Sequence, residues 1–128
     1  MQILFILNKK HRRAELQDVV EICRGKSPES LAILDDIDCD SVFIDGLHAY
    51  PHPKIDIQKC YQKMKPGSII IGHDCFHLQW GNGIMESLNE FLYEEKIETN
   101  VFFMNHIPSE EEKQKHGVPR CGLFWFYK

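Results

Sequence analysis

The chain has 128 residues, 43% hydrophobic and 27% charged, with 15 Lys and Arg against 19 Asp and Glu, a formal net charge of −4 at pH 7. These values fit one folded domain over residues 1–128 with a single core. The net negative charge argues against a surface that binds nucleic acid or an anionic membrane. No apolar run approaches the roughly 20 residues that span a bilayer.

Two strands are predicted in the first 25 residues. Residues 2–7 are an apolar run bounded by charge, which is typical of a buried strand. Residues 14–23 are ambiguous, because the apolar spacing there suits a helix while the β-branched run at residues 19–23 that precedes Gly25 suits a strand. We favour the strand.

A helix is predicted to begin at Ser27 and to end near residue 34. The serine hydroxyl can cap the helix, Pro28 suits the first helical position, and Glu29 places an acid at the positive end of the helix dipole. Residues 41–45 then predict a strand, because they are mostly β-branched or aromatic and Gly46 ends the run.

The middle of the chain continues the alternation of helices and strands. A helix is predicted after Pro53 from four residues at i, i+3, i+4 and i+7 spacing, which are Ile57, Cys60, Tyr61 and Met64. Residues 68–72 form an apolar strand of the kind that is buried on both faces of a parallel sheet. Residues 81–83, Gly-Asn-Gly, predict a loop before an amphipathic helix that carries Ile84, Leu88, Phe91 and Leu92.

The end of the chain predicts an antiparallel hairpin. Residues 101–104 and 122–127 are apolar and aromatic strands, and the acidic stretch at residues 110–113 is expected to be part of a long solvated loop between them. Taken together, the elements predict an α/β fold with a doubly wound, mostly parallel sheet and an antiparallel C-terminal hairpin.

Polar residues follow the two central strands of this predicted sheet. Asp45 and His48 come after the strand at 41–45, and His73 and Asp74 after the strand at 68–72. Ligands bind at the carboxyl ends of parallel strands, and neighbouring strands lie about 4.8 Å apart, so the four side chains are expected to converge.

Several roles fit this cluster. Carboxylates with imidazole can hold Mg²⁺ or Mn²⁺, and a bound cation would lower the pKa of an acceptor hydroxyl. Alternatively, His48 or His73 could act alone as a general base, because imidazole titrates near neutral pH. The plainer alternatives are that each Asp caps a helix and that His73 is a hydrogen-bonded buried side chain.

The five cysteines argue against a disulfide framework and against a zinc knuckle, because their number is odd and none form a close pair. The apolar run at residues 3–7 is too short for a signal sequence, and its basic residues follow rather than precede it. We therefore expect reduced thiols, a cytoplasmic protein and no membrane or nucleic-acid partner.

The stretch from Ser41 to Tyr50 and the stretch from Met64 to Asp74 resemble class I S-adenosylmethionine-dependent methyltransferases of the methyltransferase domain 24 type. Those proteins have a strand ending in FIDG-[DG]-H-x-Y, a helix, a KPGG turn and a strand ending in GHD; here the segments read SVFIDGLHAY and MKPGSIIIGHD. The resemblance covers roughly residues 18–128 and implies a Rossmann-like methyltransferase fold.

The resemblance implies S-adenosylmethionine as the cofactor and transfer of a methyl group to oxygen of a small molecule or sugar. The cofactor contacts that it implies are Gly25, Lys26 and Ser27 near the adenine, and Asp45 and Gly46 near the methionine end. Asp45 and Asp74 are the implied ligands of a cation, Mg²⁺ or Mn²⁺. His48 and His73 are the implied catalytic residues, with His48 as the base near the acceptor.

The chain departs from the family pattern at several positions. Lys26 replaces the usual Asp, Leu47 replaces an acidic residue, and the Gly-x-Gly-x-x-Gly turn after the first strand is absent. A truncated methyltransferase fold is therefore expected, with the missing contacts supplied by a second copy, because an exposed sheet edge favours a homodimer. Two alternatives stay open, a non-catalytic module that binds no cofactor and a metal-dependent hydrolase.

Overall fold

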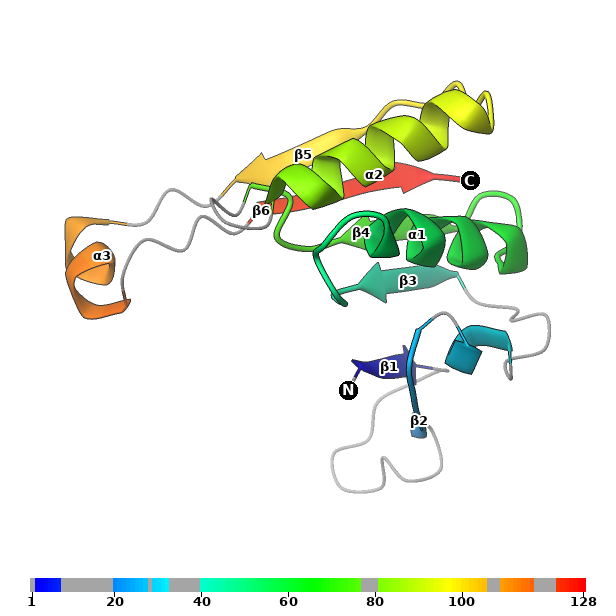
Figure 1. Cartoon of the computed structure of the whole chain (residues 1–128), viewed down its shortest axis with the longest axis horizontal. Helices are drawn as coiled ribbons and strands as arrows, with labels where there is room; N and C mark the ends of the chain where they lie inside the picture. The colour runs from blue at the N-terminus through cyan, green and yellow to red at the C-terminus, as the bar shows by residue number, and fades with distance from the viewer. Residues whose placement is uncertain are drawn as a thin grey trace.

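The computed structural model describes residues 2–7, 20–27, 29–32, 40–76, 81–105, 109–116 and 122–128. Its centre is a four-stranded sheet with two helices packed on it (Figure 1). In sheet order, the strands are β3 (Ser41–Ile44), β4 (Ile69–Gly72), β6 (Gly122–Tyr127) and β5 (Phe102–Asn105). The helices are α1 (His52–Lys63) and α2 (Gly81–Glu94).

The pairing of the strands confirms the predicted α/β class. Strands β3 and β4 are parallel, with Ile44 opposite Gly72, and α1 connects them as the crossover helix. Strand β6 is antiparallel to both β4 and β5, and Phe102 lies opposite Trp125. Strands β5 and β6 are therefore the predicted C-terminal hairpin.

The core lies between the sheet and the two helices. Alternate residues of β4 and β6 are buried, as expected where one sheet face is covered. Helices α1 and α2 close this face with the predicted apolar residues, and the buried cluster includes Ile57, Ile70, Leu88, Phe91, Phe124 and Phe126. A Cβ at Gly72 would collide with the ring of Phe124, so the glycine lets that ring lie directly on β4.

The N-terminal residues form a separate two-stranded antiparallel sheet. Strand β1 (Gln2–Leu7) pairs with β2 (Val20–Gly25), which confirms both predicted strands. Within the helix predicted from Ser27, the described residues form a 3₁₀ turn, η2 (Glu29–Ala32), rather than an α-helix. Its predicted continuation to residue 34 lies outside them.

Two predicted loops are wrong. Residues 81–83 form the first turn of α2 rather than a loop before it. Residues 110–113 begin a short helix, α3 (Glu110–His116), that lies away from the sheet (Figure 1). A capping box explains this helix: Ser109 Oγ accepts from the backbone N–H of Glu112, and the Glu112 carboxylate accepts from the N–H of Ser109 at 2.7 Å.

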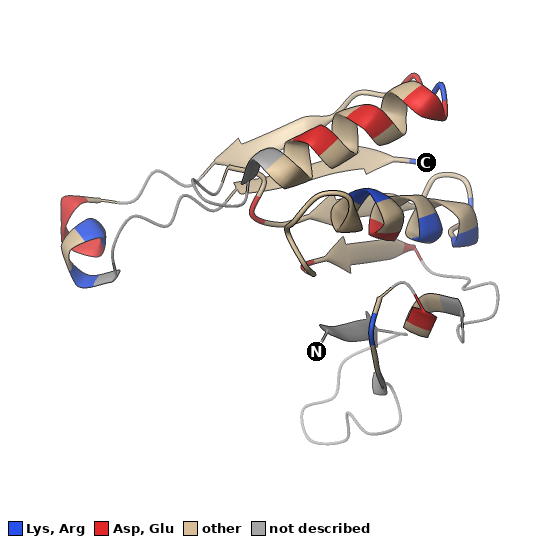
Figure 2. Cartoon of the chain, viewed as in Figure 1, with Lys and Arg blue, Asp and Glu red and all other residues tan. Residues whose placement is uncertain are grey.

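The described helices are all too short or too polar to cross a lipid bilayer. Charge is concentrated on the outward sides of the helices, whereas the four strands of the central sheet carry none (Figure 2).

Candidate active site

The four polar residues predicted to converge do so at the carboxyl ends of β3 and β4. His48 Nε2 lies 3.6 Å from Asp45 Oδ1 and 3.4 Å from Asp74 Oδ2. His73 Nδ1 lies 3.6 Å from Asp45 Oδ1 and 3.1 Å from Asp74 Oδ1. Each imidazole therefore faces both carboxylates, and we call these four residues the rim cluster.

The parallel pairing of β3 and β4 sets the position of the rim cluster. The N–H of His73 donates to the carbonyl of Ile44 at 3.0 Å, which carries the ladder one residue past the end of β4. Asp74 then adopts the left-handed conformation, with φ 59°, a region that Asp occupies more readily than most residues. This change of direction brings Asp74 back toward His48 instead of letting it continue along the strand.

Two nitrogen atoms of the rim cluster, His48 Nε2 and His73 Nδ1, are buried and have no hydrogen-bond partner among the described residues. A buried polar atom that lacks a partner costs about 1–3 kcal/mol. Both atoms lie within 4 Å of carboxylate oxygens but without hydrogen-bond geometry. Such atoms are typical of a site that a ligand completes.

Asp45, His48 and Asp74 fit a divalent cation. Each offers one ligand atom, and the three atoms lie within 4.8 Å of one another. Two ligands at about 2.1 Å from one metal lie about 3.0 Å apart at a right angle and about 3.4 Å apart at the tetrahedral angle. His48 Nε2 lies 3.6 Å from Asp45 Oδ1 and 3.4 Å from Asp74 Oδ2, so small movements of these side chains would bring the three atoms to metal-ligand spacing.

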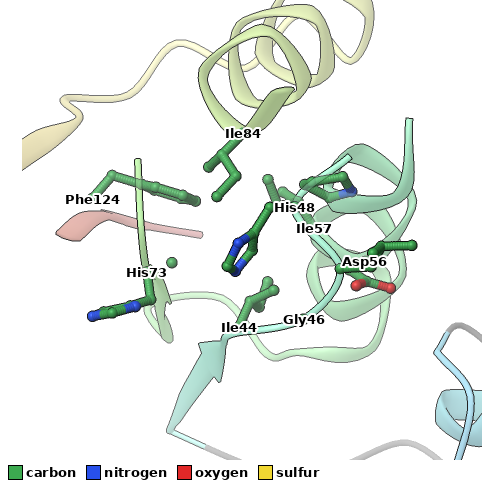
Figure 3. Close-up of a pocket in the computed structure, with 11 residues that line it drawn as sticks. Ile44, Gly46, His48, Asp56, Ile57, His73, Ile84 and Phe124 are labelled. Atoms are coloured by element: carbon green, nitrogen blue, oxygen red, sulfur yellow. The ribbon is translucent and has the colours of Figure 1, made fainter. Parts of the chain in front are cut away.

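A pocket adjoins the rim cluster (Figure 3). It holds about 270 Å³ of empty space, including its opening to solvent. The His48 ring lies at its centre, whereas the His73 ring points outward (Figure 3). Its walls come from both central strands, both helices and β6, and comprise Ile44, Gly46, Leu47, His48, Pro53, Asp56, Ile57, Gly72, His73, Ile84 and Phe124.

The segment predicted to approach the adenine, Gly25–Ser27, reaches this pocket through one side chain. Ser27 Oγ donates to the carboxylate of Asp56, which is buried and lines the pocket. Lys26 is exposed, and neither it nor Gly25 is among the residues that line the pocket. The structure therefore places Ser27 beside the pocket, whereas Gly25 and Lys26 do not line it.

The sequence matches the family model described as "Methyltransferase domain" over residues 2–75, which is more than half of the chain. The chain belongs to the methyltransferase domain family. The match confirms the resemblance seen in the sequence and extends it to β1. None of the curated proteins matches this methyltransferase domain.

Two solved structures share the fold of this methyltransferase domain. One is an O-methyltransferase from Bacillus cereus in complex with SAH, with 18% identity, a TM-score of 0.61, and coverage of 91% of this chain and 54% of that chain. The other is a candidate O-methyltransferase from Klebsiella pneumoniae, with 16% identity, a TM-score of 0.54, and coverage of 80% and 46%. The chain therefore spans about half the length of the solved structures that it matches.

In this methyltransferase domain, helix α2 contacts the loop after β3 at two points. A Cβ on Gly83, in the first turn of α2, would lie 2.5 Å from the carbonyl oxygen of His48 and 3.0 Å from the nitrogen of Tyr50. The Tyr50 hydroxyl donates to Glu90 at 2.8 Å, and this bond raises the pKa of Tyr50 and lowers that of Glu90. Lys54 joins the same group through Glu90 and Glu94.

Sequence reasoning missed Asp56 and the role of Gly83. Asp56 occupies the apolar side of α1, three residues after Pro53 and four before Cys60, and a carboxylate on a buried helix face is a signal that could have identified it. Gly83 gave no such signal, because the sequence does not show which backbone lies against the first turn of α2.

Proposed function

We propose that this chain binds S-adenosylmethionine and transfers its methyl group to a hydroxyl oxygen of a small molecule. The observation that carries the proposal is the meeting of Asp45, His48 and Asp74 at the carboxyl ends of β3 and β4, in a member of the methyltransferase domain family. Open α/β sheets bind their ligands at this edge. The family match also favours methyl transfer over the alternative of a metal-dependent hydrolase.

The pocket suits one end of the cofactor. Its empty space of about 270 Å³ includes the opening to solvent, so the pocket can enclose at most a part of the cofactor. We propose that the pocket takes the methionine part of the cofactor. Asp45 would face the ammonium group of that methionine, and the backbone of Gly46 would lie beside its carbon chain. Ser27, held by Asp56 at the pocket wall, puts the predicted adenine segment within reach.

His48 is the proposed base. The cofactor would supply a methyl group on a positively charged sulfur; the sulfur–methyl bond breaks as the acceptor oxygen bonds to the methyl, which leaves S-adenosylhomocysteine. The acceptor hydroxyl must lose its proton in this step. His48 Nε2 would take the proton, and the carboxylates of Asp45 and Asp74 would stabilise the imidazolium. The apolar walls exclude water and orient the reactants.

A divalent cation offers a second version of the same role. If Asp45, His48 and Asp74 hold Mg²⁺ or Mn²⁺, the cation lowers the pKa of the acceptor hydroxyl, and His73 is then the free imidazole at the rim. Mn²⁺ binding followed by electron paramagnetic resonance separates the two versions. Binding of one ion that Asp74→Asn weakens at least about tenfold supports the cation, and no binding at millimolar Mn²⁺ leaves His48 as the base.

Calorimetry with S-adenosylhomocysteine tests cofactor binding. We expect a dissociation constant below about 1 mM, weakened at least about tenfold by Asp45→Asn, because about 1.4 kcal/mol of binding is lost with the charge. Asp40→Asn is the matched control, since Asp40 precedes the other end of β3 and pairs with Lys65 at the surface. An absence of heat for the folded wild-type chain at millimolar ligand would instead support the non-catalytic module.

A further inference from the structure

Strand β5 forms one border of the central sheet, and among the described strands it pairs on one side alone. The sheet order places β5 last, paired on one side with β6. All four of its residues are exposed, with 43% of Phe102, 44% of Phe103 and 53% of Met104 accessible. The outer side of β5 therefore offers backbone N–H and C=O groups flanked by large apolar side chains.

Strand β5 lacks the devices that usually protect such an edge. Natural edge strands are blunted by charged side chains, proline, bulges or a covering element. Residues 102–105 read Phe-Phe-Met-Asn and contain neither charge nor proline, and their register with β6 is continuous, without a bulge. No helix covers β5 in the part of the chain that the structure describes; α3, the nearest in sequence, lies away from the sheet (Figure 1).

The aromatic side chains of β5 are already held in place on the two faces of the sheet. Phe102 stacks on Trp125 with ring centroids 5.6 Å apart, and Phe103 contacts Phe76 at 5.9 Å. Fixed side chains lose little conformational freedom on association, which favours binding.

We propose that β5 pairs with β5 of a second copy of this chain, antiparallel and edge to edge. A strand that pairs with itself about a two-fold axis presents the same residues from both sides, so the uncharged, apolar edge is complementary to itself. The pairing would join two sheets into one and satisfy the outer backbone groups of both strands. It does not depend on the proposed methyl transfer.

The proposed interface is small, so the dimer is expected to be weak. An aromatic side chain buries about 150–250 Å², and the three half-exposed side chains therefore offer on the order of 300 Å² per copy, against about 800 Å² in a standard stable interface. We expect a dissociation constant between about 10 µM and 1 mM. The rim cluster lies at the ends of β3 and β4, separated from β5 by β6, so pairing leaves it open.

Sedimentation equilibrium from about 5 µM to 1 mM tests the pairing. We expect a concentration-dependent dimer that Met104→Lys weakens at least tenfold, because a lysine on an edge strand opposes pairing. Tyr93→Lys is the matched control: Tyr93 is 85% exposed on α2, and the substitution should leave the dimer unchanged. Circular dichroism checks folding, and Asn105→Lys repeats the test at the last residue of β5 if Met104→Lys unfolds.

Hydrogen exchange locates the contact. Amides of residues 102–105 should exchange more slowly at concentrations that favour the dimer, while those of α1 should not change. A monomer throughout the concentration range would overturn the proposal. A dimer that both lysine variants on β5 leave intact would also overturn it, because its contact would lie elsewhere.

Discussion

The interior of the sheet and its carboxyl edge are built from the same strands but differ in chemistry. Ile70 and Phe126 are fully buried against the helices, in a cluster of apolar side chains. One step beyond the end of β4, His73 and Asp74 face a second acid and a second imidazole, Asp45 and His48. Among the described residues, His48 Nε2 and His73 Nδ1 find no hydrogen-bond partner. The difference indicates that stability comes from the interior and chemistry from the edge, so each should respond to different substitutions.

The largest effect is expected in the interior. Phe126→Ala should lower the free energy of unfolding by about 3–5 kcal/mol, because it removes a fully buried ring and leaves a cavity. The neighbouring substitution Tyr127→Ala should cost much less, since that side chain is half exposed. Urea denaturation of both variants measures the difference, and equal losses would mean that the interior does not carry the stability.

Gly83 tests the connection between the two regions. Gly83→Ala should lower the free energy of unfolding by about 1–3 kcal/mol, because the added Cβ would lie 2.5 Å from the carbonyl oxygen of His48 and force α2 away from that loop. It should also weaken binding of S-adenosylhomocysteine by moving His48. The exposed Asn89→Ala in the same helix is the control and should change neither quantity. Unchanged binding by Gly83→Ala would show that the loop does not depend on this contact.

A smaller, pH-dependent effect is expected from Cys75, which is buried beside the rim cluster. Burial raises the pKa of this thiol to about 11 from an ordinary value of 9.0. The folded state therefore favours the neutral thiol, and this contribution to stability is present below pH 9 and is lost as the pH rises toward 11. Cys75→Ala should lessen the fall in the urea midpoint between pH 9 and 11; parallel curves for the variant and the wild type would contradict the assignment.

The sequence predicted the elements and the rim cluster well because both depend on local patterns. The apolar run before Asp45 and the run before His73 identified two strands, and parallel pairing alone brings their ends together. The described part of the helix predicted after Ser27 is a 3₁₀ turn, a type of helix that capping residues do not distinguish from an α-helix. The α3 helix was missed because the Ser109–Glu112 capping box lies in a stretch that reads simply as charged.

The pocket could not be predicted from local sequence patterns. Phe124 lines it from β6, about 50 residues after β4 in the sequence, and its place follows from antiparallel pairing that only the folded sheet establishes. Asp56 is joined to Ser27 across 29 residues, and nothing in either local sequence points to the other. Contacts between residues distant in sequence, such as Ser27 and Asp56, determine whether the predicted adenine segment lies beside the pocket.

Amide chemical shifts in a titration with S-adenosylhomocysteine test the central claim most directly. The account predicts that the largest shifts fall at the carboxyl ends of β3 and β4, on Gly46, His48 and His73, with little change in α3 or β5. Shifts confined to other parts of the sheet, or equal shifts for the wild type and Asp45→Asn, would contradict it, because the rim cluster would then not be the binding site.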